Sequence, residues 1–392
     1  MLALRLARGA HPLVQLRRLL VAAAAAGTGF LLLCTLAYAM EHPGAGAVLR
    51  LAWCVAPIAA TVYFAVAVAR TDPGTRPRAG LSAVGLGPGR LMVLAAISTA
   101  VACTLGSMLA LLFFLHLRGD LSGLPFDGAA AELLAADEPL PLAAALTLLA
   151  LVPVIASAAS ALVLRPRTAK AGTTSGTGPE AEPDAPAAAP SGLPWGVALL
   201  AAGLAVETYA SRSGDGPGTG TGFPMPGGLA GSPAGVLAGW ALTALGLALA
   251  GPGLTHLCGR VLQSVRPGAV RLLAGRVLQQ EARRIGRPLG VVCAVASGAY
   301  ASVVLYAGPR PDVGPLTALG ALLVAGCAVL TLATASIEAR QARSHTTAAL
   351  LRLGAPATML RSSAALRAGA LAAVFGPLTW VVAELAALPL AP

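Results

Sequence analysis

Nine apolar runs, most of them twenty residues or longer, constrain the fold of this chain more than any other feature. A helix needs about 20 apolar residues to cross the hydrocarbon core of a bilayer. We therefore expect an all-α membrane protein with about nine transmembrane helices. The predicted spans cover residues 19–40, 47–69, 89–117, 140–164, 193–210, 234–258, 288–307, 315–337 and 357–388.

Composition supports lipid rather than water or nucleic acid as the surroundings of this chain. Hydrophobic residues make up 56% and charged residues 11%, whereas about a quarter of the residues in soluble domains are charged. The net charge of +11 might suggest nucleic acid, but aromatic residues make up only 4%, too few for base-stacking platforms. We expect membrane lipid and no nucleic acid as a partner.

The basic residues predict the orientation of the chain. If the N-terminus is cytoplasmic, 23 of the 27 Lys and Arg residues fall in cytoplasmic segments, alternating through all nine spans. Positive charge favours the cytoplasmic side of a membrane. The pattern predicts an N-in/C-out, multi-pass protein of the plasma membrane, and we expect a bacterial source. The richness in Arg, Ala and Gly indicates a GC-rich genome.

The chain repeats itself at a spacing of about 267 residues. Because six spans separate the two starts, the copies have the same orientation and form two parallel repeats. The predicted division is a first unit at 1–165, a disordered cytoplasmic linker at 166–192, two connecting spans at 193–258 and a second unit at 259–392. The matched residues are Arg5, Gly9, Arg17 and Arg18 with Arg271, Gly275, Arg283 and Arg284, then Arg76, Leu86 and Gly87 with Arg343, Leu353 and Gly354.

The stretch after Pro267 is amphipathic. Val270, Leu273, Ala274, Val277 and Leu278 recur at helical spacing, and Arg271, Arg276, Arg283 and Arg284 occupy the opposite side. Such a pattern is typical of a helix that lies on a membrane surface. We expect this helix on the inner leaflet, with its arginines toward lipid phosphates or a partner protein.

Two cytoplasmic loops, 70–90 and 338–356, are the candidates for docking a partner. Both are short and basic, and both carry Leu-Gly in the same register. The second reads Ala-Leu-Leu-Arg-Leu-Gly-Ala-Pro, an apolar helical turn stopped by Gly and Pro. The candidate docking residues are Arg76, Arg78, Leu86, Gly87, Arg343, Leu351, Arg352, Leu353 and Gly354.

Residues 340–388, and more weakly 76–117, resemble the FtsX-like permease family of ABC transporters, which includes the macrolide- and lipoprotein-exporter permeases. The resemblance implies that the chain contains two FtsX-like units and is a permease or transducer subunit. It also implies that two copies of a cytoplasmic ABC ATPase bind the ATP, dock on these loops and drive the subunit. The chain departs from the family in its short outer loops at 41–47 and 308–314 and in Arg343-Ser344, where an Arg-Glu pair is usual.

No cofactor or metal site is expected on the chain itself. The one lysine, Lys170, stands in Thr-Ala-Lys-Ala-Gly, which excludes the Gly-Lys-Ser/Thr of a nucleotide-binding P-loop. The six cysteines form no Cys-x-x-Cys and are expected to be small buried residues. The chain is therefore not expected to be an enzyme, and any ATP hydrolysis would take place on a partner.

Two other functions remain open at this point. An ion-coupled secondary transporter needs acidic residues inside the membrane, and the candidates Glu207, Glu338 and Glu384 lie near the ends of spans. An intramembrane enzyme finds little support, because Ser107 and His116 lie about 13 Å apart along one helix.

Overall fold

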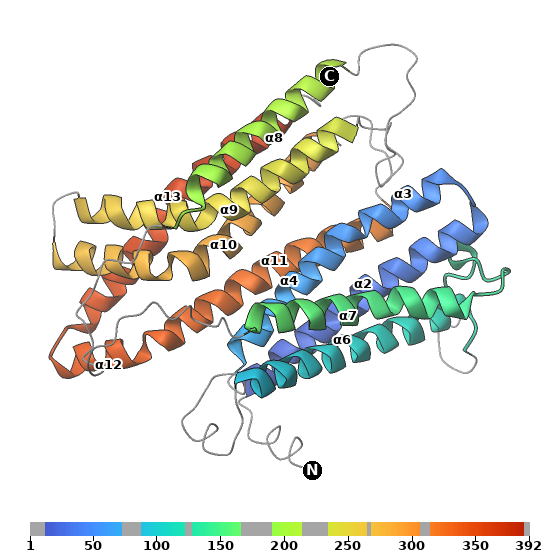
Figure 1. Cartoon of the computed structure of the whole chain (residues 1–392), viewed down its shortest axis with the longest axis horizontal. Coiled ribbons are helices and arrows are strands. Elements are labelled where there is room, and N and C mark those ends of the chain that lie inside the picture. Colours follow the sequence, from blue (N-terminus) through green and yellow to red (C-terminus); the bar gives the residue numbers. More distant parts are fainter. Residues whose placement is uncertain are drawn as a thin grey trace, which may run out of the picture. The chain divides into compact units, whose positions relative to one another are not determined.

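The computed structural model describes residues 12–72, 88–121, 128–165, 190–213, 234–264, 268–305 and 314–387 (Figure 1). Within these ranges the chain is α-helical, with one short 3₁₀ helix and no β-strand. The expected all-α class is confirmed. The helices are α2 (Pro12–Glu41), α3 (Ala45–Trp53), α4 (Val55–Thr71), α6 (Pro88–Arg118), η2 (Glu132–Leu134), α7 (Leu142–Leu164), α8 (Leu193–Ser213), α9 (Ala234–Ser264), α10 (Ala269–Leu305), α11 (Pro315–Ala342), α12 (Ser344–Arg352) and α13 (Ala357–Ala387).

The predicted apolar runs match these helices closely. Eight segments of the described chain are long and apolar enough to cross a membrane, which makes this a multi-pass membrane protein. The ninth predicted span, 288–307, falls in the second half of α10 and is not among the eight. The count of nine and the N-in/C-out orientation remain predictions.

The predicted span at 47–69 differs, because it is divided between α3 and α4. The break lies at Cys54, whose N–H donates to the Leu51 carbonyl at 3.1 Å in a tighter turn. Pro57 follows three residues later and has no N–H to give to the carbonyl of Trp53. A proline removes one helical hydrogen bond, which explains why the helix is interrupted here.

The helices pack into two compact units. The first unit contains α2, α3, α4, α6 and α7 together with α11 up to Thr334. The second contains α8, α9, α10, α12, α13 and the last residues of α11, from Ala335. The two predicted connecting spans, α8 and α9, thus pack with α10 and α13. The predicted division into two FtsX-like repeats is a statement about sequence, and it remains a prediction.

In the first unit, α2 lies among α4, α6 and α7. Gly106 of α6 packs against Ala25 of α2 so closely that a side chain there would overlap the α2 backbone. Thr28 and Thr61 share a buried hydrogen bond of 2.8 Å between α2 and α4. Small residues allow helices to approach closely in lipid, where apolar burial alone gives little preference for one partner.

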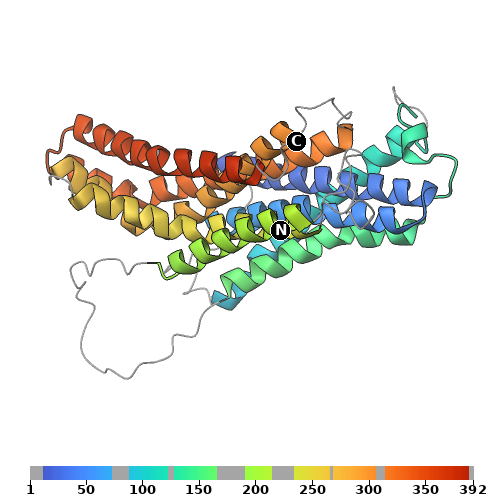
Figure 2. The ribbon, with the colours of Figure 1, turned by 90° about the horizontal axis from the view of Figure 1, so that it is seen from above.

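In the second unit, α9 lies between α8 and α10, and α13 runs alongside α10 (Figures 1 and 2). Glycines allow α9 to approach both α8 and α10 closely. A Cβ on Gly246 would come within 2.5 Å of the Leu200 backbone in α8. A Cβ on Gly286 would come within 2.5 Å of Pro252.

All six cysteines are buried free thiols, as the sequence predicted. Five of them lie in five different helices and Cys54 lies at the break between α3 and α4, and the chain therefore uses them as small apolar residues.

Candidate functional site

The predicted amphipathic segment is the first half of α10 and is continuous with the apolar residues that follow. The helix runs unbroken from Ala269 to Leu305 with Pro288 inside it, and its neighbour α9 contains Pro252. Both helices change direction along their length (Figure 1), as expected at internal prolines. The pair therefore continues beyond the apolar run of α10 as a two-helix extension.

The basic and apolar sides of this extension are as the sequence predicted. Arg271, Arg276, Arg283 and Arg284 are exposed, whereas Ala274 and Leu278 are buried. The buried side packs against α9, since a Cβ on Gly275 would come within 2.6 Å of the Gly259 carbonyl. Part of the apolar face that we expected to rest on lipid is thus covered by protein. Contact of the arginines with lipid remains a prediction.

The predicted turn after Leu350 is present and its hydrogen bonds explain its sequence. The helix α12 ends at Arg352, and Gly354 follows with a φ of 87°. The Gly354 N–H donates to the Leu351 carbonyl at 3.1 Å and the Ala355 N–H to the Leu350 carbonyl at 3.0 Å. This is the Schellman arrangement, which places glycine at the left-handed position. Pro356 then precedes α13, so the chain reverses within a few residues.

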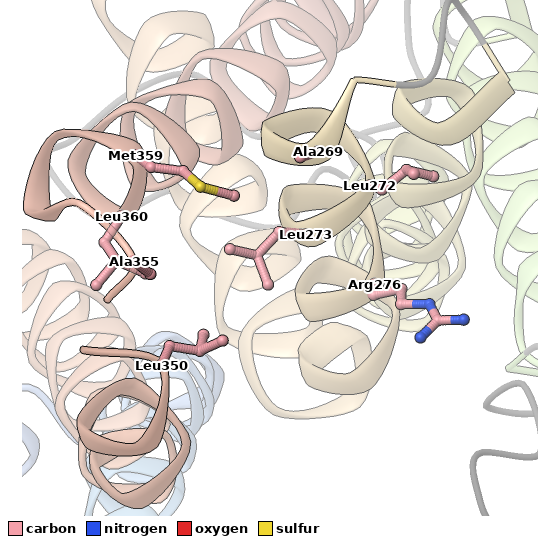
Figure 3. A pocket seen from close by; sticks show the side chains of 8 residues that line it. All are labelled: Ala269, Leu272, Leu273, Arg276, Leu350, Ala355, Met359 and Leu360. Atoms are coloured by element: carbon pink, nitrogen blue, oxygen red, sulfur yellow. The ribbon is translucent and has the colours of Figure 1, made fainter. Parts of the chain in front are cut away.

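An apolar groove of about 340 Å³ lies between the first half of α10 and the turn that joins α12 to α13 (Figure 3). Leu273 points into it from α10, while Leu350 and Met359 approach from the other side. Arg276 lies at its edge with the guanidinium directed away from the apolar side chains. The groove is lined by Ala269, Leu272, Leu273, Arg276, Leu350, Ala355, Met359 and Leu360.

The α12 turn beside the groove exposes large apolar side chains, although it lies outside the predicted spans. Leu353 is 84% exposed and Leu351 is 49% exposed, and both flank the exposed Arg352 in the α12 turn. Large exposed leucines around a groove are typical of a surface that binds another protein. Four of the predicted docking residues (Leu351, Arg352, Leu353 and Gly354) therefore lie in one turn beside the groove.

Arg343, the remaining predicted docking residue of this loop, forms an ion pair within the structure, and its role in docking remains a prediction. It lies between α11 and α12 and donates to Glu281 of α10 at 3.0 Å. Burial raises the pKa of the Glu281 carboxyl, while the charge and hydrogen bond of Arg343 and the charge of Arg284 lower it and leave a net upward shift. The pair ties the start of α12 to α10, the helix that forms the opposite wall of the groove.

The candidate docking residues of the first unit, Arg76, Arg78, Leu86 and Gly87, lie outside the described residues. The described part of that unit nevertheless contains a matching ion pair. Arg18 of α2 donates to Asp72 at 2.5 Å, directly after the end of α4. Arg343 likewise follows directly after α11 and pairs with α10. One ion pair thus joins α2 to the residue that follows α4, and the other joins α10 to the residue that follows α11, with the charges exchanged.

Sequence reasoning undervalued two acidic residues in the second unit. Glu207 of α8 is fully buried and accepts a hydrogen bond from the indole N–H of Trp240 in α9 at 2.5 Å. Glu384 of α13 accepts from Tyr300 at 2.7 Å and from Trp380 at 3.0 Å. Trp240 and Tyr300 are far from their glutamates in the sequence, at separations of 33 and 84 residues. Only the Trp380–Glu384 pair, four residues apart on one helix, could have been noticed in the sequence.

No protein-family model, curated protein or solved structure matches this chain.

Proposed function

We propose that the chain is the membrane subunit of an ABC transporter or of an ABC-type transducer, and that a separate cytoplasmic ATPase docks in the groove between α10, α12 and α13. The observation that carries this proposal is the groove itself, with Leu351 and Leu353 exposed in the turn between its lining residues Leu350 and Ala355. The first unit would offer its loop at 70–90 to a second ATPase copy.

The chemistry of the groove specifies the partner surface. The walls are aliphatic, so they suit an apolar helix or turn. The arginines around it, Arg271, Arg276 and Arg352, favour acidic residues at the edge of the partner. A nucleotide-binding site is expected on that partner, because the single lysine of this chain does not stand in a P-loop.

The structure offers a route by which docking could move the membrane part. The groove wall is the first half of α10, and α10 continues without interruption into its apolar half. The Glu281–Arg343 pair joins the same helix to the start of α12. A displacement of the α12 turn by the ATPase would thus be passed to α10, and Pro288 marks where the helix can bend.

The test is co-purification of the full chain with each P-loop ATPase of the source organism that lacks membrane spans of its own, using variants that change the groove. Leu353→Asn removes an exposed apolar contact, and Ala269→Trp fills the groove from the exposed start of α10. Val261→Asn serves as the matched control, because Val261 is also an exposed apolar residue of the α9–α10 extension but does not line the groove.

Losing one buried leucine side chain from an interface costs about 2 kcal/mol, which corresponds to roughly 30-fold in affinity. We expect a loss of that order for Leu353→Asn and a comparable or larger one for Ala269→Trp, while Val261→Asn binds like the parent. Equal affinity in all three variants, or a loss confined to Val261→Asn, would contradict docking at the groove.

A further inference from the structure

A carboxyl group is enclosed within the apolar part of the second unit. Glu207 has no exposed surface, although it lies within the candidate membrane span Leu193–Ala210. The helices meet closely around it, because a Cβ on Gly239 would come within 2.8 Å of the Glu207 Cβ. Acidic side chains in a membrane are costly and usually functional, so this residue needs an explanation.

The polar contacts of Glu207 are too few for a carboxylate. Its Oε1 accepts the Trp240 indole N–H, whereas its Oε2 is buried and has no hydrogen-bond partner among the described residues. Ionised carboxylates in proteins commonly accept several hydrogen bonds or pair with a cation. One donor on one oxygen leaves most of the charge of an ionised Glu207 uncompensated.

Among the described side chains of the helices around Glu207, no positive charge lies next to it. The sequence of α9 from Ala234 to Gly251 contains no titratable residue. Trp240 packs against a cluster of Ala301 in α10 and Ala386 and Ala387 in α13. The described titratable groups at that end of α10 and α13 are Tyr300 and Glu384, and the Tyr300 hydroxyl donates to Glu384. On α8 itself the nearest is Tyr209, which is 76% exposed.

Glu207 forms no ion pair with a described side chain. Arg212 lies further along α8, and its side chain is outside the described part. A metal ion is also unsupported, because no group of three or more His, Cys, Asp or Glu residues gathers anywhere in the described chain. A proton would neutralise this buried carboxylate and turn the unpartnered Oε2 into a hydrogen-bond donor.

We propose that Glu207 is a proton-binding site between α8 and α9, occupied at neutral pH, with the Trp240 indole holding the neutral carboxyl in place. As an acid, Oε2 becomes an O–H donor that can bond to a helix carbonyl, as Thr208 and Thr255 do in the same helix pair. Release of the proton to water leaves a buried charge, which favours separation of α8 from α9 so that water reaches the site.

This site is independent of the docking groove, and its test needs no partner protein. The full chain is purified in lipid nanodiscs, and infrared spectroscopy follows the carbonyl band of a protonated carboxylic acid. Ordinary glutamates titrate near pH 4.3, so a band that remains at about pH 7 identifies a carboxyl that keeps its proton. The parent should show this band, and Glu207→Gln should lose it.

Glu384→Gln is the matched control, because Glu384 is the other acidic residue held by a tryptophan in this unit but is partly exposed and accepts two hydrogen bonds. It should keep the band. Absence of the band in the parent at neutral pH, or its persistence in Glu207→Gln, would overturn the proposal. So would its loss in Glu384→Gln alone.

A second variant tests the role of the indole. The Trp240 N–H stabilises the ionised form of Glu207 more than the neutral form, so Trp240→Phe should move the loss of the band to higher pH by about one pH unit or more. An unchanged or lower pH for that transition would contradict the assignment.

A fluorescence measurement tests whether water reaches the site. In a variant whose single tryptophan is Trp240, quenching of the tryptophan fluorescence by acrylamide should increase at the same pH at which the infrared band is lost. The three other tryptophans, replaced by Phe, are Trp53, Trp195 and Trp380.

Discussion

Gly354 offers a direct test of how the groove is built. It adopts a φ of 87°, and a Cβ placed on it would have no atom within 4 Å. The effect of Gly354→Ala is therefore conformational and not steric. A non-glycine residue in the left-handed region costs about 1–2 kcal/mol, and the loss of glycine flexibility in the unfolded chain returns about 0.4–1 kcal/mol. The net cost is roughly 1 kcal/mol.

That cost should appear as local opening of the α12 turn, since the affected hydrogen bonds are those of Gly354 and Ala355 to the end of α12. A cost of roughly 1 kcal/mol corresponds to about five-fold faster hydrogen exchange for amides that exchange through this opening. The assay is hydrogen–deuterium exchange with mass spectrometry on the peptide that covers residues 344–356 in the detergent-purified full chain.

Gly369→Ala is the control. Gly369 also has no atom within 4 Å of its Cβ position, but it lies inside α13 with an ordinary helical backbone. Alanine should stabilise that helix by about 0.5–1 kcal/mol. Gly354→Asn should fall between glycine and alanine, because asparagine adopts the left-handed region more readily. Faster exchange in Gly369→Ala, or unchanged exchange in Gly354→Ala, would refute the reasoning.

Two further predictions concern contacts that hold the second unit together. Arg343→Ala should destabilise the chain by about 1–3 kcal/mol at neutral pH, because Glu281 is left buried without its cation. The folded-state pKa of Glu281 is raised, so the folded state binds its proton more tightly and gains stability as pH falls. Thermal unfolding over a pH series should therefore show that the stability difference between the parent and Arg343→Ala becomes smaller toward acid pH. A difference that does not change with pH would exclude this cause. Gly286→Leu should greatly reduce the yield of folded protein in gel filtration, because its side chain would overlap the backbone at Pro252 and Gly251; a normal yield would contradict the close packing of α9 and α10.

Much of the helical architecture could be predicted, because a helix that crosses a membrane needs a long apolar run, and such runs are visible in the sequence. The runs at 89–117, 140–164 and 315–337 correspond to α6, α7 and α11 within a few residues. The Schellman turn at Gly354 was also predictable, since glycine and proline mark such turns locally. The division of the second run into α3 and α4 could have been anticipated from Pro57.

The packing could not be predicted in the same way. Alanine, glycine and leucine occur on every side of these helices, so hydrophobic periodicity does not reveal which face meets which partner. The Glu207–Trp240 contact joins residues 33 positions apart through the glycines that bring α8 and α9 together. The pairing of α9 with the amphipathic half of α10 depends on Gly259 and Gly275 in the same manner.

The most direct test of the proposed function is site-specific photo-crosslinking at the groove. A photoreactive amino acid is placed at Leu353, and in a matched sample at Val261, in membranes that contain the full chain and the ATPase that co-purifies with it. The account predicts a crosslink to the ATPase from position 353 that position 261 does not form. Crosslinks from position 353 to lipid alone, or equal crosslinks from both positions, would contradict docking of an ATPase at this groove.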